Sequence, residues 1–180
     1  MGDQLPRVTE ILNAVGLGPD LSRVRPDILD AALVRGAAVH ALIEAMHYGY
    51  LDEADITPDL APYIAAFRRF LAESKYEPIA CEIEVTDARW GYRGHPDLIG
   101  WLLRQRIVID VKTGDATGGS YQVAAYAGAW SAEHPSEPVK AGAILHLRAN
   151  GTYRLEEIEM APALDVFRAA VIVYQAQQRR

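Results

Sequence analysis

The first part of the chain carries the hydrophobic spacing of α-helices. Apolar residues recur every three or four positions, which predicts a short helix over 5–17 and a longer one from Pro26 to Gly49. A third helix is predicted to begin at Thr57-Pro58, where an N-cap residue precedes proline. The residues expected on one side of the second and third helices are Leu33, Ala37, His40, Ala41 and Glu44, and then Leu60, Ile64, Phe67 and Leu71. We therefore expect residues 1–76 to be mainly helical.

From residue 77 onward the pattern becomes typical of strands. The predicted elements are β-rich runs over 78–85, 92–103 and 106–113, an alanine-rich helix over 120–130, a strand pair around Asn150-Gly151, and a last helix over 161–180 with Leu164, Phe167, Val171 and Tyr174 in register. The order β-β-β-α-β-β-α predicts an α/β or α+β domain with a central mixed sheet flanked by helices. Because the chain has no internal repeat or linker, residues 1–180 are expected to form one domain, with residues 77–180 as its core.

Composition narrows the classes of protein that fit this pattern. The formal net charge is −6, which argues against a basic protein that coats nucleic acid by charge alone. The single cysteine, Cys81, excludes an internal disulfide and any zinc or iron–sulfur site that needs four cysteines. No apolar run approaches the roughly 20 residues of a membrane span, and the N-terminus has no signal-peptide pattern. We expect a soluble cytoplasmic protein that does not enter a membrane.

Two charged residues, Asp110 and Lys112, interrupt a run that otherwise fits a buried strand. Burying ions costs several kcal/mol each unless they have partners, so partners are expected nearby. A turn centred on Arg104-Gln105 places Asp97 opposite Lys112 and Ile99 opposite Asp110. Residues two apart on a strand share a face, so Asp97, Asp110 and Lys112 are predicted to converge.

Two carboxylates on one face suit a hard cation such as Mg²⁺ or Mn²⁺. A lysine beside them would polarise a water molecule or stabilise charge on a phosphoryl group. The preceding run adds Glu82 and Glu84, which alternate with apolar residues and therefore share a face, although plain amphipathic alternation explains one of the two. His40 alone has an ordinary explanation, as a packed or surface histidine of an alanine-rich helix.

Five short motifs occur in order between Leu5 and Trp130. They are RGAAVH over 35–40, CEIEV over 81–85, YRGHPDLIG over 92–100, IVIDVKTG over 107–114 and YQVAAYAGAW over 121–130, after an opening LPRVTEIL over 5–12. Together they resemble the PD-(D/E)XK nuclease superfamily in its RecB-type exonuclease branch, which includes the mitochondrial genome maintenance exonuclease and its phage and bacterial relatives. Each motif is weak alone, but five in order with ordinary spacing form a strong signal. The resemblance implies a restriction-endonuclease-like core.

The resemblance also implies roles for individual residues. The implied metal ligands are His40, Asp97, Asp110, the backbone carbonyl of Val111, and Glu82 in preference to Glu84. The implied catalytic residues are Asp97, Asp110, Lys112 and Glu82. Gln122 and Tyr126 match a QxxxY element that faces the site and the DNA. Asp110 departs from the glutamate of many superfamily members, although aspartate is common in this branch.

Further contacts to substrate are expected from a hairpin over 87–94. Its residues Arg89, Trp90, Tyr92 and Arg93 would stack bases and hold phosphates beside the site, although an ordinary surface hairpin explains them equally well. Arg35, shortly before His40, is expected to approach a phosphate.

The implied activity is hydrolysis of DNA by a Mg²⁺- or Mn²⁺-dependent exonuclease, with a water activated by the metal and Lys112. No iron–sulfur cluster and no nucleotide are expected, because the chain lacks four cysteines and a Walker A loop. The alternatives are a structure-specific or restriction-type endonuclease of the same fold, and a catalytically silent nucleic-acid-binding module. The partner is DNA, as a single strand or a duplex end, while polarity, the choice between DNA and RNA, and oligomeric state stay open.

Overall fold

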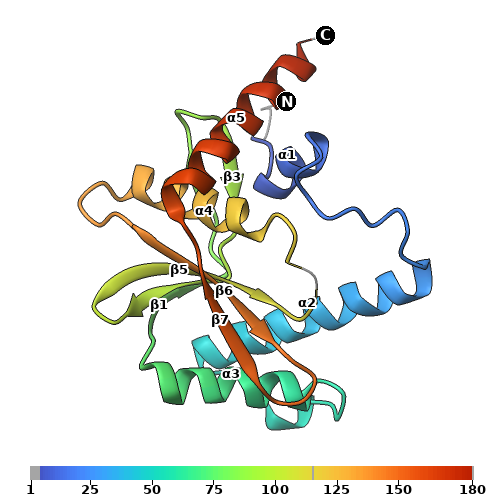
Figure 1. Cartoon of the computed structure of the whole chain (residues 1–180). Helices are drawn as coiled ribbons and strands as arrows, with labels where there is room; N and C mark the ends of the chain where they lie inside the picture. The colour runs from blue at the N-terminus through green and yellow to red at the C-terminus, as the bar shows by residue number, and fades with distance from the viewer. Residues whose placement is uncertain (1–4, 115, 180) are drawn as a thin grey trace.

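A mixed sheet of five strands in the order β1-β4-β5-β6-β7 forms the centre of the protein (Figure 1). The computed structural model describes residues 5–114 and 116–179. The strands of this sheet are β1 (Glu77–Cys81), β4 (Leu98–Leu102), β5 (Gln105–Lys112), β6 (Ala141–Leu147) and β7 (Tyr153–Glu157). Only β5 and β6 pair in parallel, and α4 (Gly119–Glu133) connects them. The expected α+β architecture with a central mixed sheet is confirmed.

Helices cover both faces of this sheet. The helices on one face are α1 (Val8–Ala14), α4 and α5 (Met160–Gln178), and those on the other are α2 (Pro26–Tyr48) and α3 (Ala61–Ser74), with a short 3-10 helix η1 (Glu53–Asp55) between α2 and α3 (Figure 1). Along β5, Val108 is buried on the α4 side, whereas Ile109 and Val111 are buried on the α2 and α3 side. β5 is therefore apolar on both faces, as expected of a strand with helices above and below it.

One helix prediction needs correction, and the structure adds to a second, because the five residues predicted on one side of α2 do line one groove. α3 begins at Ala61 and not at Thr57-Pro58, because the carbonyl of Thr57 accepts from the amides of Leu60 and Ala61 and makes a turn first. In α2 the buried residues are Val39, Leu42, Ile43 and Ala45, whereas Leu33, on the expected side, is 59% exposed. Only the second half of α2 packs in the core, so the predicted side of this helix faces a groove instead.

Two of the predicted β-rich runs each divide into two strands. The first run breaks at Glu82, whose φ of 51° is left-handed, and continues as β2 (Val85–Asp87). The second run begins as β3 (Tyr92–Gly94) and breaks before β4 at a segment that contains Pro96, which has no N–H to donate to a ladder. β2 and β3 pair with each other as a separate two-stranded sheet. Five strands rather than three therefore precede α4.

The turn between β4 and β5 lies one residue earlier than predicted. Leu102 pairs with Gln105, and the two residues between them, Leu103 and Arg104, have φ of 49° and 65°. This backbone normally uses Asn-Gly, so its sequence signal is missing here. As a result Ile99 pairs with Val108 and not with Asp110, and the predicted pairing of Asp97 with Lys112 is wrong. The shift is by two residues, which leaves each side chain on the predicted face.

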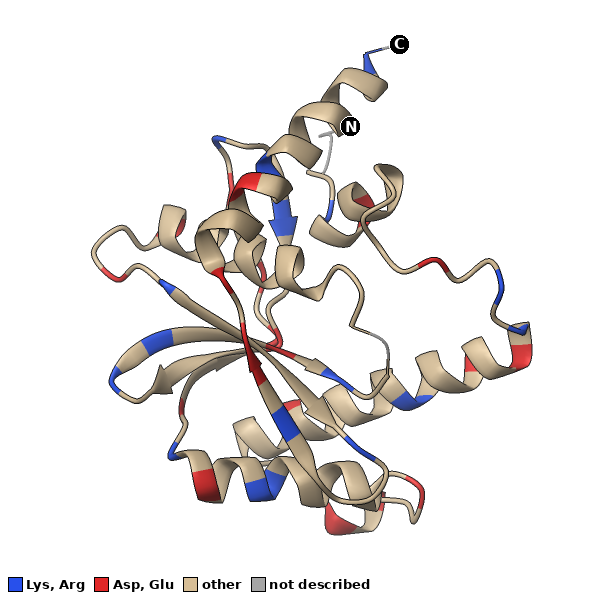
Figure 2. Cartoon of the chain, in the orientation of Figure 1, with Lys and Arg blue, Asp and Glu red and all other residues tan. Residues whose placement is uncertain are grey.

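The distribution of charge and hydropathy adds two observations. Basic and acidic residues of the described chain are interspersed over both helical layers (Figure 2). Among the described residues, no helix has the length and apolar character that a bilayer crossing requires.

Candidate metal centre

Three side chains from separate elements converge beside the end of β5. His40 comes from α2, Glu82 follows β1, and Asp97 precedes β4. One ligand atom of each lies within 4.8 Å of those of the other two. The Nδ1 atom of His40 lies 2.9 Å from Glu82 Oε1 and 3.4 Å from Asp97 Oδ1. The structure thus brings together three of the residues predicted to hold a metal ion.

The backbone of Val111 adds a fourth polar group to this cluster. Its carbonyl oxygen lies 3.1 Å from Nε2 of His40, as the resemblance implied for a carbonyl ligand. Its amide donates a hydrogen bond of 2.5 Å to Asp97 Oδ2. Val111 therefore fixes Asp97 to β5 and presents an oxygen to the same histidine.

The cluster forms where the strands are interrupted. Glu82 leaves the β1 ladder in a left-handed conformation, and its amide donates to the carbonyl of Asp97 at 3.1 Å. Glu84, in contrast, accepts a hydrogen bond of 2.6 Å from Arg93 and takes no part in the cluster. The break at Glu82 separates the two glutamates that uninterrupted alternation predicts to share a face.

Asp110 and Lys112 form a second, adjoining pair. The Asp110 side chain is 1% exposed, and Lys112 Nζ donates to its Oδ1 at 3.1 Å. Nζ also lies 2.8 Å from Oδ2, as an ion-pair contact without hydrogen-bond geometry. Lys112 further donates to Gln122 Oε1 at 3.3 Å, and Gln122 Nε2 donates to the Tyr126 hydroxyl at 2.7 Å. The Asp110 carboxylate thus faces Lys112 and lies outside the group of three converging ligands.

The close carboxylates perturb the protonation of their neighbours. Burial favours the neutral ring of His40, but hydrogen bonds to Asp97 and Glu82 outweigh burial and raise the pKa of His40 to about 11. Burial and the charge of Asp97 raise the pKa of Asp110 above its ordinary value, and Lys112 offsets this only in part. The raised pKa of His40 reflects the two carboxylates that face it, whereas that of Asp110 reflects burial first and the charge of Asp97 second.

The donor set fits a divalent metal ion. Carboxylate and carbonyl oxygens with one imidazole nitrogen are ligands that Mg²⁺ and Mn²⁺ accept. Without such an ion, the protonated ring of His40 supplies the positive charge among these oxygens. His40, Glu82, Asp97 and the Val111 carbonyl are therefore able to hold a metal ion.

A groove of about 700 Å³ runs along α2 to this centre. The groove is lined by apolar residues such as Leu21, Leu29 and Leu33 and by the polar residues Arg35, His40 and Lys112. The Nε atom of Arg35 is buried without a hydrogen-bond partner in the described part of the chain, and its guanidinium lies 5.8 Å from the ring centre of Tyr63. Arg35 is thus placed where the sequence predicted a contact to substrate.

The hairpin over 87–94 does not form the predicted contact surface. Tyr92 is 1% exposed, donates a hydrogen bond of 2.9 Å to the Ala125 carbonyl, and packs against Phe167. Arg93 is also buried, where it donates to Glu84 at 2.6 Å and to the carbonyl of Leu5 at 2.9 Å. The prediction that Tyr92 and Arg93 bind substrate is wrong, because both side chains hold the hairpin to the core.

Arg89 and Trp90 lie at a different pocket, none of whose lining residues borders the groove of His40. They are therefore not beside the site as predicted.

Tyr126 also differs from its prediction. The residue, ring included, is 4% exposed, and in the described part of the chain its contact with the site is the hydrogen bond that its hydroxyl accepts from Gln122. A Cβ atom at position 94 would overlap this ring, so Gly94 is required for the close approach. Sequence reasoning missed this role of Gly94, although a glycine inside a strand pattern is the usual signal of such an approach.

The fold and the site define an α+β protein with a His–Glu–Asp group that is able to hold a metal ion. No family model matches the chain, and no curated protein matches it. A solved structure described as "Crystal structure of SSO0001" is similar over 75% of this chain and 74% of that chain, with 15% identity and a TM-score of 0.34. A similarity at this TM-score carries no argument about fold or function.

Proposed function

We propose that the protein is a Mg²⁺- or Mn²⁺-dependent deoxyribonuclease of the PD-(D/E)XK superfamily, with a restriction-endonuclease-like core, and that it acts as an exonuclease. One observation carries this proposal: His40, Glu82, Asp97 and the Val111 carbonyl converge beside Lys112. These residues come from four separate motifs and meet only in the folded chain. A structural role alone does not explain so many partly buried charged groups at one point.

Each residue has a distinct part in the proposed reaction. His40, Glu82, Asp97 and the Val111 carbonyl would hold the metal ion, and Asp110 would join them as a ligand only if its carboxylate turned from Lys112 toward the ion. A bound divalent ion lowers the pKa of a coordinated water and stabilises negative charge on the phosphate. Lys112 is kept in place by Asp110 and Gln122, so its ammonium group is oriented before substrate arrives.

The proposed reaction is a hydrolysis without a covalent intermediate. A water oxygen forms a bond to phosphorus while the bond from phosphorus to the leaving sugar oxygen breaks. The attacking water loses a proton to solvent, and the leaving oxygen gains one from solvent, so the step is balanced. Lys112 contributes by directing the water and by stabilising the charge that develops on the phosphate oxygens.

The groove along α2 supplies the proposed approach for the DNA end. Arg35 has no ion-pair partner in the described ranges and borders this groove together with Lys112. A guanidinium without an internal acceptor suits a phosphate oxygen. Arg35 is therefore the proposed contact to a phosphate next to the one that is cleaved.

The test is digestion of end-labelled linear DNA, single- and double-stranded, beside a covalently closed circle. We expect loss of label from linear DNA with Mg²⁺ or Mn²⁺, no loss with EDTA, and no loss with Asp110→Ala. Cleavage of the circle would show that the activity is that of an endonuclease of the same fold and not of an exonuclease. Absence of Mn²⁺ binding in calorimetry, together with intact DNA, would instead indicate a binding module.

A further inference from the structure

The tip of the β2–β3 hairpin, α4 and α5 enclose a second pocket of about 510 Å³. It shares no lining residue with the groove at the metal centre. Small residues of α4, among them Ala124, Ala127 and Gly128, line it together with Met160 and Leu164 of α5. Small side chains leave room for an entering group, and methionine adapts to groups of different shape. The pocket therefore offers an apolar surface to a ligand.

Three cationic side chains, Arg89, Lys140 and Arg168, border this pocket. Across residues 5–114 and 116–179, no ion pair joins any of the three to a carboxylate. Other arginines of the protein do have such pairs, namely Arg25, Arg68, Arg69, Arg93, Arg106 and Arg154. The three cations thus give this pocket a concentration of positive charge in a chain whose net charge is −6.

Arg168 gives the clearest sign of a missing partner. Its guanidinium lies 5.2 Å from the ring centre of Trp90, and its buried Nε has no hydrogen-bond partner among the described residues. A buried donor without an acceptor is costly. Asp87 lines the same pocket, but its Oδ1 accepts from the amides of Arg89 and Trp90 and so shapes the hairpin tip. Arg168 therefore borders the pocket with a guanidinium that the described residues do not saturate.

We propose that this pocket binds an acidic peptide segment of a partner protein, with an apolar side chain on the α4 surface and carboxylates at the three cations. Clusters of arginine and lysine recognise acidic motifs in this way, and guanidinium groups bind carboxylates through paired hydrogen bonds. A nucleic-acid strand fits less well, because the ring of Trp90 already stacks with Arg168. The separation from the metal groove also gives such a strand no continuous path.

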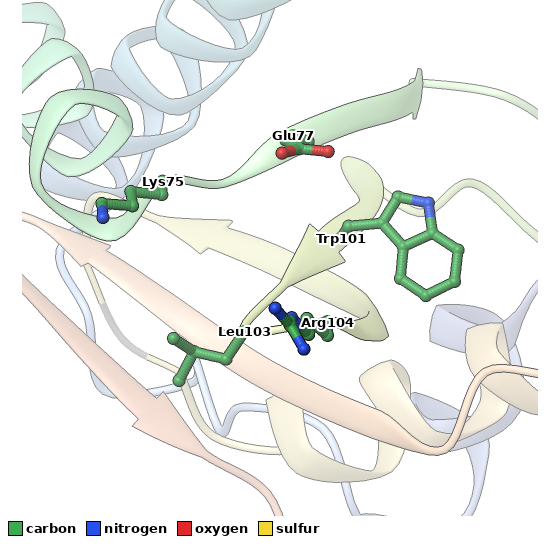
Figure 3. Close-up of a pocket in the computed structure, with 5 residues that line it drawn as sticks. All are labelled: Lys75, Glu77, Trp101, Leu103 and Arg104. Carbon is green, nitrogen blue, oxygen red and sulfur yellow. The ribbon is translucent and has the colours of Figure 1, made fainter.

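A surface on another part of the protein provides a matched control. Figure 3 shows Lys75, Arg104 and Trp101 around a pocket of about 290 Å³, which therefore has two cations and an indole in its lining. Glu77 supplies a carboxylate there, and Leu103 is 83% exposed. That surface has the same chemical groups as the α4–α5 pocket but lacks a floor of small residues.

The test is fluorescence anisotropy of a labelled peptide, Asp-Asp-Glu-Leu-Phe, with the intact protein. We expect saturable binding that weakens with salt. Lys140→Glu and Arg89→Glu should each weaken it roughly 3- to 10-fold, while Arg104→Glu leaves it unchanged. Replacing the acids by Asn-Asn-Gln, or Leu-Phe by Gly-Gly, should weaken binding in either case. Arg168→Lys keeps the positive charge but loses the planar guanidinium with its paired donors, so it should weaken peptide binding as well.

The proposal is overturned if the wild type shows no saturable binding, or if Lys140→Glu and Arg104→Glu bind the peptide equally. It is also overturned if a thymidine oligonucleotide, and not the peptide, loses affinity in Lys140→Glu. Thermal melting checks that each variant is folded. Digestion of end-labelled DNA by Lys140→Glu should equal that of the wild type, so this result is independent of the proposed nuclease activity.

Discussion

The metal centre and the α4–α5 pocket use charge in opposite ways. At the metal centre His40 contacts Glu82 and Asp97, and Lys112 contacts Asp110. At the α4–α5 pocket the cations Arg89, Lys140 and Arg168 have no carboxylate partner in the described part of the chain. A metal ion at the first site must therefore displace the proton of His40, whereas a ligand of the second site would bring the negative charge that its cations lack. The two sites should respond differently to substitution and to pH.

The largest difference between the two sites is expected in the rate of DNA cleavage when one lysine of each site is replaced. Lys112→Ala should lower single-turnover cleavage of DNA about 10²- to 10³-fold, because it removes a group that stabilises charge on the reacting phosphate. DNA binding should be largely retained. Lys140→Ala, at the other pocket, should cleave at the wild-type rate. Wild-type cleavage by Lys112→Ala would remove the catalytic assignment.

The second largest difference between the two sites is expected in how they respond to pH. The pKa of His40 is raised to about 11 in the folded protein, against an ordinary value of about 6.5. The proton on its ring stabilises the metal-free protein fully below the ordinary pKa, and this stabilisation is lost as pH rises toward the raised one. Urea denaturation in EDTA should show a free energy of unfolding that falls by about 1 kcal/mol per pH unit above neutrality.

His40→Gln should flatten this pH dependence, and Mn²⁺ affinity in calorimetry should rise with pH because the metal displaces the proton. Peptide binding at the α4–α5 pocket does not involve His40, so it should not follow the pH dependence of the metal centre. A pH-independent Mn²⁺ affinity would contradict the protonated state of His40.

Two glycines test the packing of α4: Gly94 of β3 lies against it, and Gly128 is part of it. Gly94→Ala should lower the free energy of unfolding by about 1–3 kcal/mol, because the new methyl group would overlap the Tyr126 ring. Gly128→Ala should be nearly neutral. Its methyl group would lie 3.1 Å from the Tyr92 hydroxyl and 3.3 Å from Leu164 Cδ1, and better helix propensity, about 1 kcal/mol, offsets this crowding. Equal melting temperatures for the two variants would contradict the close approach at Gly94.

The smallest expected effect distinguishes two arginines. Arg35→Ala should weaken binding of a DNA strand roughly 3- to 10-fold in Ca²⁺ without cleavage, since one phosphate contact is lost. Arg89→Ala should leave DNA affinity unchanged, because Arg89 lies at the peptide pocket. Electrophoretic mobility shift measures both. If Arg89→Ala loses DNA affinity and Arg35→Ala does not, the hairpin over 87–94 is a substrate contact after all.

Alternation and helical periodicity predicted the order of most elements and the faces of β5, because these depend on burial of apolar side chains. They did not predict where the strands are interrupted. The left-handed turn at Glu82 uses no glycine, and the Leu103-Arg104 turn uses no Asn-Gly, so neither shows in the local sequence. The metal centre depends on the break at Glu82. Its residues were therefore predicted by resemblance and its geometry was not.

The α4–α5 pocket could not be predicted at all. Arg89, Lys140 and Arg168 belong to three distant segments, and nothing in the sequence near each one indicates that it lacks a partner. Tyr92 and Arg93 were misassigned for a related reason. An aromatic and a cationic side chain fit a nucleic-acid surface as well as a core, and only the contacts with Phe167 and Glu84 decide between them.

The backbone contacts of Val111 affect which mutations the metal centre tolerates during evolution. Its side chain is buried, its amide holds Asp97, and its carbonyl faces His40. Almost any codon at position 111 encodes the same amide and carbonyl, so point mutation rarely removes these two contacts; proline alone lacks the N–H. A single-residue insertion in the preceding turn would instead reverse the direction of every side chain along β5. The metal centre is therefore more sensitive to insertions and deletions before β5 than to substitutions at position 111.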